Sequence, residues 1–194
     1  MEIIKLFPTL VGRHNNIKFA NEVLPIANKL LEGREKNHLG YVNTYSDSEV
    51  HDHLSSIDFI TEYINFISYG YISSIGFSIN VETELSLFVS NMTEGDHMPS
   101  HIHPRSILSG ICYLECEPVS APIVFEDYRD IRLFNGLVSM GEYNLDLYNE
   151  YNNREIEFYP KNGDILIWES WMRHYVKPNA STTRKTIVWN LSYK

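Results

Sequence analysis

Residues 160–168, Pro160-Lys161-Asn162-Gly163-Asp164-Ile165-Leu166-Ile167-Trp168, join a turn to a short apolar strand. Proline, asparagine and glycine favour the turn, whereas isoleucine and tryptophan favour an extended chain. The same alternation of turn residues and short apolar runs recurs throughout the chain after Gly76. Many short strands separated in this way are typical of an antiparallel sandwich or barrel. We therefore predict a mainly β fold, with strands at 77–81, 85–91, 107–115, 122–126, 155–159, 164–169 and 185–192.

The first third of the chain has a different pattern. Apolar residues recur at three- and four-residue spacing through 16–33 and again through 55–69, which is typical of amphipathic helices. Pro25 lies inside the first pattern, so that helix is expected to start late or to kink. Ser55 is a plausible cap of the second helix, since Asp58 follows three residues later.

Length and composition describe one ordinary globular domain. The chain has 194 residues, of which 43% are hydrophobic and 21% are charged, and this is enough for one well-buried core. We expect a single domain over 1–194, with a helical part at 1–75 packed on a β core at 76–194.

Charge and cysteine content exclude several classes of partner. The net charge is −9, whereas binding to nucleic acid needs clustered cations, so we expect no nucleic-acid partner. No apolar run approaches the roughly 20 residues that span a membrane, and the N-terminus lacks a signal-peptide pattern. Cys112 and Cys116 lie on one predicted strand about 13 Å apart, too far for a disulfide. These features favour a cytoplasmic protein without a membrane partner.

A histidine-rich segment follows Gly95. In an extended chain His101 and His103 point to the same face, because side chains alternate along a strand. A third histidine, His174, follows the strand at 164–168, and a sandwich can bring two close ligands and one distant ligand together at the mouth between its sheets. Imidazole binds Fe, Zn, Cu and Ni, so these three side chains predict a metal site without naming the ion. The alternative is a set of surface or hydrogen-bonded histidines.

Arg184 and Thr186 supply a second signal. They follow His174 by ten and twelve residues, and on one strand they would share a face and point into the same cavity. A guanidinium forms a bidentate, charge-assisted pair with a carboxylate, and a hydroxyl adds a further donor. A surface arginine in a polar turn is the alternative. Together with the histidines, the pair favours a carboxylate ligand beside a metal.

The chain resembles the 2-oxoglutarate/Fe(II) oxygenase family of phage and marine bacterial genomes. The resemblance rests on residues 6–9, 101–110, 123–129, 170–174 and 184–190, in the family's order. It implies a double-stranded β-helix (jelly-roll) fold, Fe(II), 2-oxoglutarate as cosubstrate and O₂. It also implies that His101 and His174 are metal ligands, and that Arg184 grips the distal carboxylate of 2-oxoglutarate with help from Thr186.

The second ligand departs from the wider superfamily, which mostly has Asp or Glu where this chain has His103. Either His103 completes a three-histidine site, or Asp127 or another carboxylate does so. We favour His103, because its spacing needs no further assumption. His97, four residues before His101, is expected in a second shell or at the substrate.

Several further roles are expected near the cosubstrate. Tyr113 either hydrogen-bonds 2-oxoglutarate or is a core aromatic, and Asn190 is expected to face the cosubstrate. Trp168 and Trp171 are expected to contribute packing. The polar stretch 130–154 is predicted to be a functional loop that sets specificity.

The expected activity is hydroxylation of a small molecule or a peptide, in the host cytoplasm if a phage encodes the chain. The oligomeric state is open, a homodimer included. One alternative is a cupin-like metal-binding protein that does not use 2-oxoglutarate, although the glutamate that cupins place soon after the H-x-H pair is missing. The other is a non-catalytic structural sandwich, which predicts no stoichiometric metal.

Overall fold

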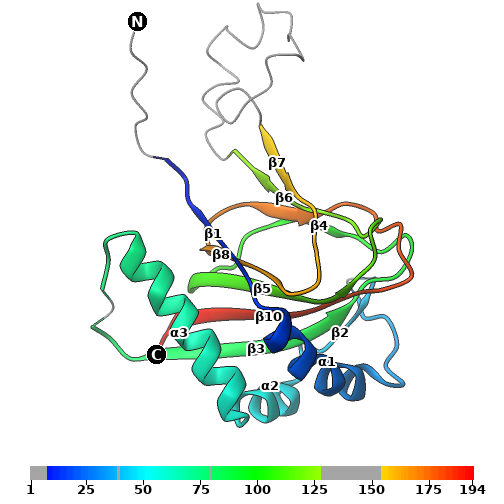
Figure 1. Cartoon of the computed structure of the whole chain (residues 1–194), viewed down its shortest axis with the longest axis horizontal. Coiled ribbons are helices and arrows are strands. Elements are labelled where there is room, and N and C mark those ends of the chain that lie inside the picture. The colour runs from blue at the N-terminus through cyan, green and yellow to red at the C-terminus, as the bar shows by residue number, and fades with distance from the viewer. Residues whose placement is uncertain (1–7, 39, 79, 128–153) are drawn as a thin grey trace, which may run out of the picture.

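A computed structural model of the protein describes residues 8–38, 40–78, 80–127 and 154–194. Nearly all of the predicted loop at 130–154 therefore lies outside the described residues. The same holds for residues 6 and 7 of the first family segment and for residues 128 and 129 of the segment 123–129. Within the described part the chain folds as a mostly β sandwich of two antiparallel sheets covered by three helices (Figure 1).

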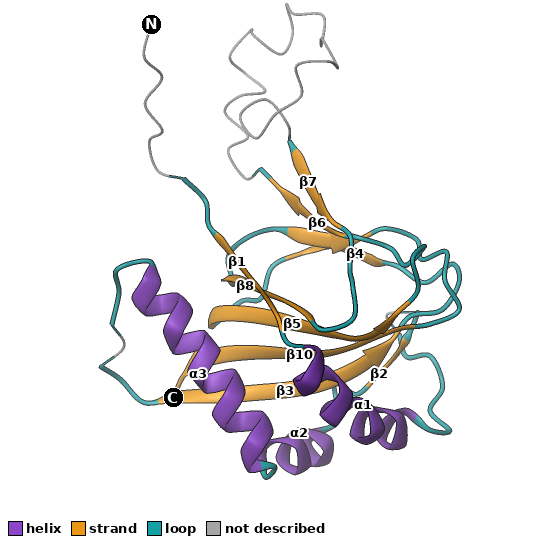
Figure 2. Ribbon diagram, in the orientation of Figure 1, coloured by secondary structure: helices purple, strands orange, loops and turns teal. Residues whose placement is uncertain are grey.

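The larger sheet carries the core. Its six strands lie in the order β1 (Val11–Asn15), β8 (Asp164–Glu169), β5 (Ser106–Cys116), β10 (Arg184–Tyr193), β3 (Thr83–Asn91) and β2 (Val42–Asn43). The smaller sheet has the order β4 (Met98–His101), β9 (His174–Val176), β6 (Ile123–Glu126) and β7 (Glu155–Phe158). Figure 2 shows the helices packed on the outer face of the larger sheet, with the smaller sheet on its other side.

The period of two along each central strand assigns its side chains to one of these two layers. On β10, Ile187, Trp189 and Leu191 belong to the core beneath the helices. The alternate residues Thr186, Val188 and Asn190 line the space between the sheets. The expected mainly β fold is thus confirmed, although β1 and β2 show that the first 75 residues also contribute strands to the larger sheet.

The helices differ in part from the prediction. Helix α1 (Ile17–Leu31) begins directly after the cap Asn16, so Pro25 does not delay its start. Helix α3 (Asp58–Ser74) has Ile57 at its cap position and no side-chain cap bond, so the predicted Ser55 cap is wrong. Ser55 instead ends α2 (Ser48–Ser55), a two-turn helix whose weak apolar pattern gave no signal.

The strands were predicted best where they are buried. The expected strand at 77–81 is wrong among its described residues, because Phe77 and Val81 are 69% and 55% exposed and bury no face. Strand β4 was missed because its sequence is polar and contains Pro99. It lies at the edge of the smaller sheet, the position where a strand tolerates proline.

Substituting Gly110 is expected to destabilise the fold strongly. A Cβ atom on this β5 residue would lie 2.2 Å from the Trp189 indole, which is fully buried and donates a hydrogen bond to Ser68. We expect Gly110→Ala to lower the free energy of unfolding by about 2 kcal/mol, as overpacking a rigid core does. Chemical denaturation measures this change in the free energy of unfolding.

The control is Gly70→Ala, inside α3, where a Cβ meets nothing within 4 Å. This substitution should raise the free energy of unfolding by about 0.5–1 kcal/mol. Equal effects of the two would contradict this packing.

The predictions of free cysteines and of no membrane-spanning segment can be compared directly with the described residues. Cys112 and Cys116 are both free thiols, as expected from their spacing. Among the described helices, none is long and apolar enough to cross a membrane.

Candidate metal and carboxylate site

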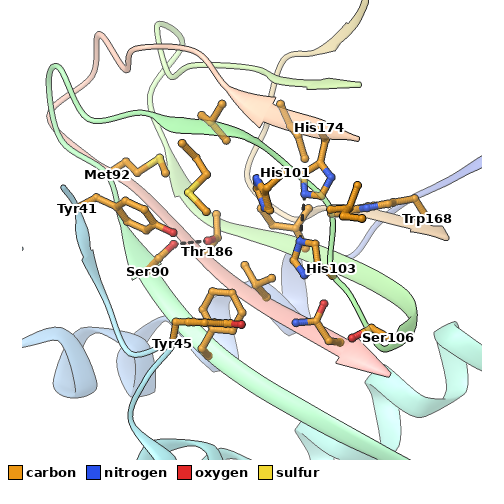
Figure 3. Close-up of a pocket in the computed structure, with 18 of the residues that line it drawn as sticks. Tyr41, Tyr45, Ser90, Met92, His101, His103, Ser106, Trp168, His174 and Thr186 are labelled. Atoms are coloured by element: carbon orange, nitrogen blue, oxygen red, sulfur yellow. Dashed lines mark hydrogen bonds between the residues drawn. The ribbon is translucent and has the colours of Figure 1, made fainter. Parts of the chain in front are cut away.

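A cavity of about 280 Å³ lies between the two sheets (Figure 3). Both sheets line it, together with the segments that precede β3 and follow β4. The lining residues that matter for chemistry are Ser90, His101, His103, Trp168, His174, Arg184, Thr186 and Asn190. Four histidines and one arginine therefore line the same cavity, and three of these histidines, His101, His103 and His174, form a cluster.

The histidines converge through strand pairing in the smaller sheet. His101 is the last residue of β4, and it pairs directly with His174, the first residue of β9. His103 lies two residues beyond β4, where the chain has already left the strand. The expectation that strand alternation aligns His101 with His103 is therefore wrong in its reason. Their imidazoles still meet, since one nitrogen of each histidine lies within 4.8 Å of the others.

Backbone carbonyls orient two of the rings. His174 Nδ1 lies 2.8 Å from the Met172 carbonyl oxygen, and His101 Nδ1 lies 2.9 Å from that of Pro99. A carbonyl can only accept, so Nδ1 carries the proton and Nε2 keeps its lone pair. Metal-binding histidines are commonly held in this way.

The surroundings keep the rings neutral. Burial lowers the pKa of all three imidazoles, to about 4 for His103 and about 3 for His174, and the neighbouring His101 lowers these two further. A neutral imidazole offers the lone pair that a metal requires. At neutral pH the three side chains are therefore ready to act as ligands.

The spacing fits one ion. His103 Nε2 and His174 Nε2 lie 3.2 Å apart. Two imidazoles bound side by side to one ion at about 2.1 Å place their nitrogens roughly 3 Å apart. Among the described residues no Asp or Glu joins the three histidines in a cluster that could hold a metal ion. The alternative ligand Asp127 lies outside that cluster, and His97 is exposed and does not line the cavity.

A buried polar network supports His103 from behind. The Asn190 side chain hydrogen-bonds His103 and accepts a hydrogen bond of 2.8 Å from the Ser109 hydroxyl. That hydroxyl also lies 2.8 Å from the Ser170 hydroxyl, and the Ser170 carbonyl accepts from the His103 backbone N–H at 3.0 Å. Asn190 thus lines the cavity and contacts the histidine, and its expected position facing the cosubstrate stays a prediction. Ser109 and Ser170 carried no sequence signal, because serines are common in every kind of segment.

Arg184 is the charged side chain of the cavity. It is 1% exposed. Its Nε donates to the Ala121 carbonyl at 3.0 Å, and its Nη atoms donate to the Tyr113 hydroxyl at 3.3 Å and to the Met92 sulfur at 3.8 Å. No carboxylate among the described residues forms an ion pair with it. Burying a charge without a counter-ion is costly, so this guanidinium is suited to a bound anion.

Two further predicted residues lie beside Arg184. Thr186 lines the same cavity, and its hydroxyl lies 2.8 Å from that of Ser90, as Figure 3 shows. Tyr113 is 1% exposed and does not line the cavity, and burial raises the pKa of its hydroxyl to about 12. Tyr113 therefore holds Arg184 in place and packs in the core.

Comparisons with known proteins give a family match and a set of structural neighbours. The family described as "Putative 2OG-Fe(II) oxygenase" matches residues 86–190, which include all three histidines, Arg184 and Thr186. No curated protein matches the chain.

Solved structures share the fold at low sequence identity. A prolyl-4-hydroxylase of Pseudomonas putida aligns over 96% of this chain and 94% of its own, with 12% identity and a TM-score of 0.59. A prolyl hydroxylase of Trichoplax adhaerens, in complex with a hypoxia inducible factor peptide fragment, aligns over 94% of this chain and 83% of its own, with 14% identity and a TM-score of 0.59. HygX of Streptomyces hygroscopicus, with nickel, 2-oxoglutarate and hygromycin B bound, aligns over 96% of this chain and 84% of its own, with 10% identity and a TM-score of 0.58. The fold is thus the double-stranded β-helix of prolyl hydroxylases. These comparisons do not support a phage origin.

Proposed function

The chain belongs to the 2OG-Fe(II) oxygenase family, and from that premise we propose that it is a 2-oxoglutarate- and Fe(II)-dependent oxygenase that hydroxylates its substrate. In this proposal His101, His103 and His174 hold Fe(II), and Arg184 binds the distal carboxylate of 2-oxoglutarate.

The observation that carries the proposal is a buried, uncompensated guanidinium in the same cavity as three neutral imidazoles. The histidines alone suit many metals and many reactions. A second, anionic group is needed to neutralise Arg184, and a dicarboxylate that reaches from the metal to the arginine supplies it. A cupin-like protein that does not use 2-oxoglutarate leaves this buried charge without a role.

The protein's contribution follows from its residues. Pro99, Met172 and Asn190 fix the orientation of the three rings, and Thr186 and Ser90 offer hydroxyls beside the guanidinium. Fe(II), when bound, would supply the redox chemistry by which 2-oxoglutarate, O₂ and a substrate C–H become succinate, CO₂ and a substrate C–OH. The apolar walls of the cavity exclude water and so strengthen the contacts of Arg184.

The substrate is proposed to be a small molecule or a peptide. The structural neighbours include one with a peptide fragment bound and one with hygromycin B bound. The aromatic pair Tyr45 and Phe88, at 5.1 Å between ring centroids, lies on the cavity wall, and Tyr45 is 49% exposed. A substrate that enters the cavity would pass this pair.

Turnover of 2-oxoglutarate tests the proposal. We expect the purified protein, supplied with Fe(II), O₂ and ascorbate, to convert 2-oxoglutarate slowly to succinate even without substrate, as measured by chromatography. Zn(II) in place of Fe(II) should give no succinate, because Zn(II) does not change its oxidation state. Stoichiometric iron binding without succinate would favour the cupin-like alternative, and absence of metal binding would favour a structural sandwich.

A further inference from the structure

The indole of Trp168 has a polar atom without a partner in the described part of the chain. Trp168 is 1% exposed, and its Nε1–H forms no hydrogen bond to any described residue. A buried donor without an acceptor loses its hydrogen bond to water and gains nothing in return. Phenylalanine would fill similar space without this cost, so packing alone does not account for tryptophan at this position.

Trp168 lies at the metal end of the cavity. It projects from β8, and its ring centroid lies 4.9 Å from that of His174 and 6.5 Å from that of His103, both nearly edge to face. In Figure 3 the side chain reaches toward these two histidines, whereas Thr186 and Ser90 lie on the other side of the cavity. The unpaired donor therefore belongs to the histidine end and not to the Arg184 end.

The imidazoles near Trp168 cannot donate a hydrogen bond to a ligand at the histidine cluster. Nδ1 of both His101 and His174 already faces a backbone carbonyl, and their other nitrogens are turned toward the cluster. The oxygens of an acidic ligand at the cluster can only accept hydrogen bonds, and the histidine nitrogens that face the cluster carry lone pairs and donate none. The indole N–H is an unused donor beside this position, and because it has less than 1 Å² of accessible surface, a small rotation of the indole is needed to bring it to such an oxygen.

We propose that Trp168 is a positioning residue that donates a hydrogen bond from Nε1 to the carboxylate of 2-oxoglutarate that lies beside the metal. The inference rests on the proposed function. It assigns the two ends of the cosubstrate to two separate donors: Arg184 holds the distal carboxylate and Trp168 orients the carboxylate next to the keto group. An oxo acid would then be selected over a ligand that has only a carbonyl at that end.

Two truncated ligands test this assignment. Pyruvate keeps the keto-acid end and lacks the distal carboxylate, whereas 4-oxopentanoate keeps the distal carboxylate and replaces the metal-end carboxylate by a methyl group. In anaerobic calorimetry on Fe(II)-loaded protein, Trp168→Phe should weaken 2-oxoglutarate and pyruvate about tenfold, the cost of one lost hydrogen bond to a charged group. Binding of 4-oxopentanoate and of Fe(II) should not change.

The control is Trp171→Phe, which alters an exposed tryptophan three residues along the chain and should change none of these affinities. If Trp168→Phe does not fold, 3-benzothienylalanine at position 168 keeps the shape and removes only the N–H. Equal weakening of all three ligands, unchanged affinities or loss of Fe(II) would overturn the role of Trp168. Failure of the unaltered protein to bind 2-oxoglutarate would instead contradict the proposed function itself.

Discussion

Replacing His174 by alanine is expected to lower the affinity for Fe(II) at least about 100-fold and to abolish formation of succinate. His174 is 4% exposed, and its ring centroid lies 4.3 Å from that of His101 and 5.0 Å from that of His103. Its loss leaves two ligands, and even outer contacts to a ligand are typically worth 10–100-fold in metal affinity. Competition with a coloured chelator measures the dissociation constant.

The matched control is His97→Ala. His97 is exposed, lies in the same histidine-rich segment and does not line the cavity, so its loss should leave Fe(II) affinity within about twofold. If His174→Ala, folded as judged by circular dichroism, still bound Fe(II) with the original affinity, the three histidines would not be the metal site.

Replacing Arg184 by glutamine is expected to weaken 2-oxoglutarate at least about 100-fold while Fe(II) affinity stays unchanged. A charge-assisted hydrogen bond contributes about 1.5–3 kcal/mol, a bidentate pair has two of them, and 1.4 kcal/mol corresponds to a factor of ten. Because Arg184 is buried without a carboxylate partner among the described residues, the ligand supplies its whole counter-charge. Anaerobic calorimetry on the Fe(II)-loaded protein gives both constants.

A neighbour on the same strand provides the control. Lys185 points away from the cavity and pairs with Glu115 at 2.6 Å, so Lys185→Gln should leave 2-oxoglutarate affinity unchanged. Pyruvate, which lacks the distal carboxylate, should bind Arg184→Gln as well as it binds the unaltered protein. A parallel loss of pyruvate affinity would mean that the substitution distorts the metal end of the cavity. Arg184 would then not be the residue that binds the distal carboxylate of 2-oxoglutarate.

The large features of this fold could be predicted from the sequence because they depend on local patterns. Buried strands such as β8 and β10 are apolar runs with β-branched side chains, and turn residues precede each of them. The alternation of side chains along β10 places Arg184 and Thr186 in one cavity, as predicted. The three histidines could be identified from the sequence because a metal needs ligand side chains of a particular type, and two of them lie close together in the chain.

What could not be predicted depends on long-range pairing. The match of His101 with His174 follows from an edge strand of polar sequence, and β4 alone shows no strand pattern. Likewise, Ser109 and Asn190 become meaningful only when β5 and β10 lie side by side. The prediction that Trp168 serves packing described its ring contacts correctly. That its N–H has no partner among the described residues is visible only in three dimensions.

The most direct test is an anaerobic titration of the Fe(II)-loaded protein with 2-oxoglutarate, followed by visible absorption. A keto acid that binds ferrous iron through its keto and carboxylate oxygens gives a weak metal-to-ligand charge-transfer band. We predict that this band appears, saturates at one 2-oxoglutarate per chain and is absent with 4-oxopentanoate. Retained iron without any band would contradict the central claim that this cavity holds 2-oxoglutarate on a three-histidine metal site.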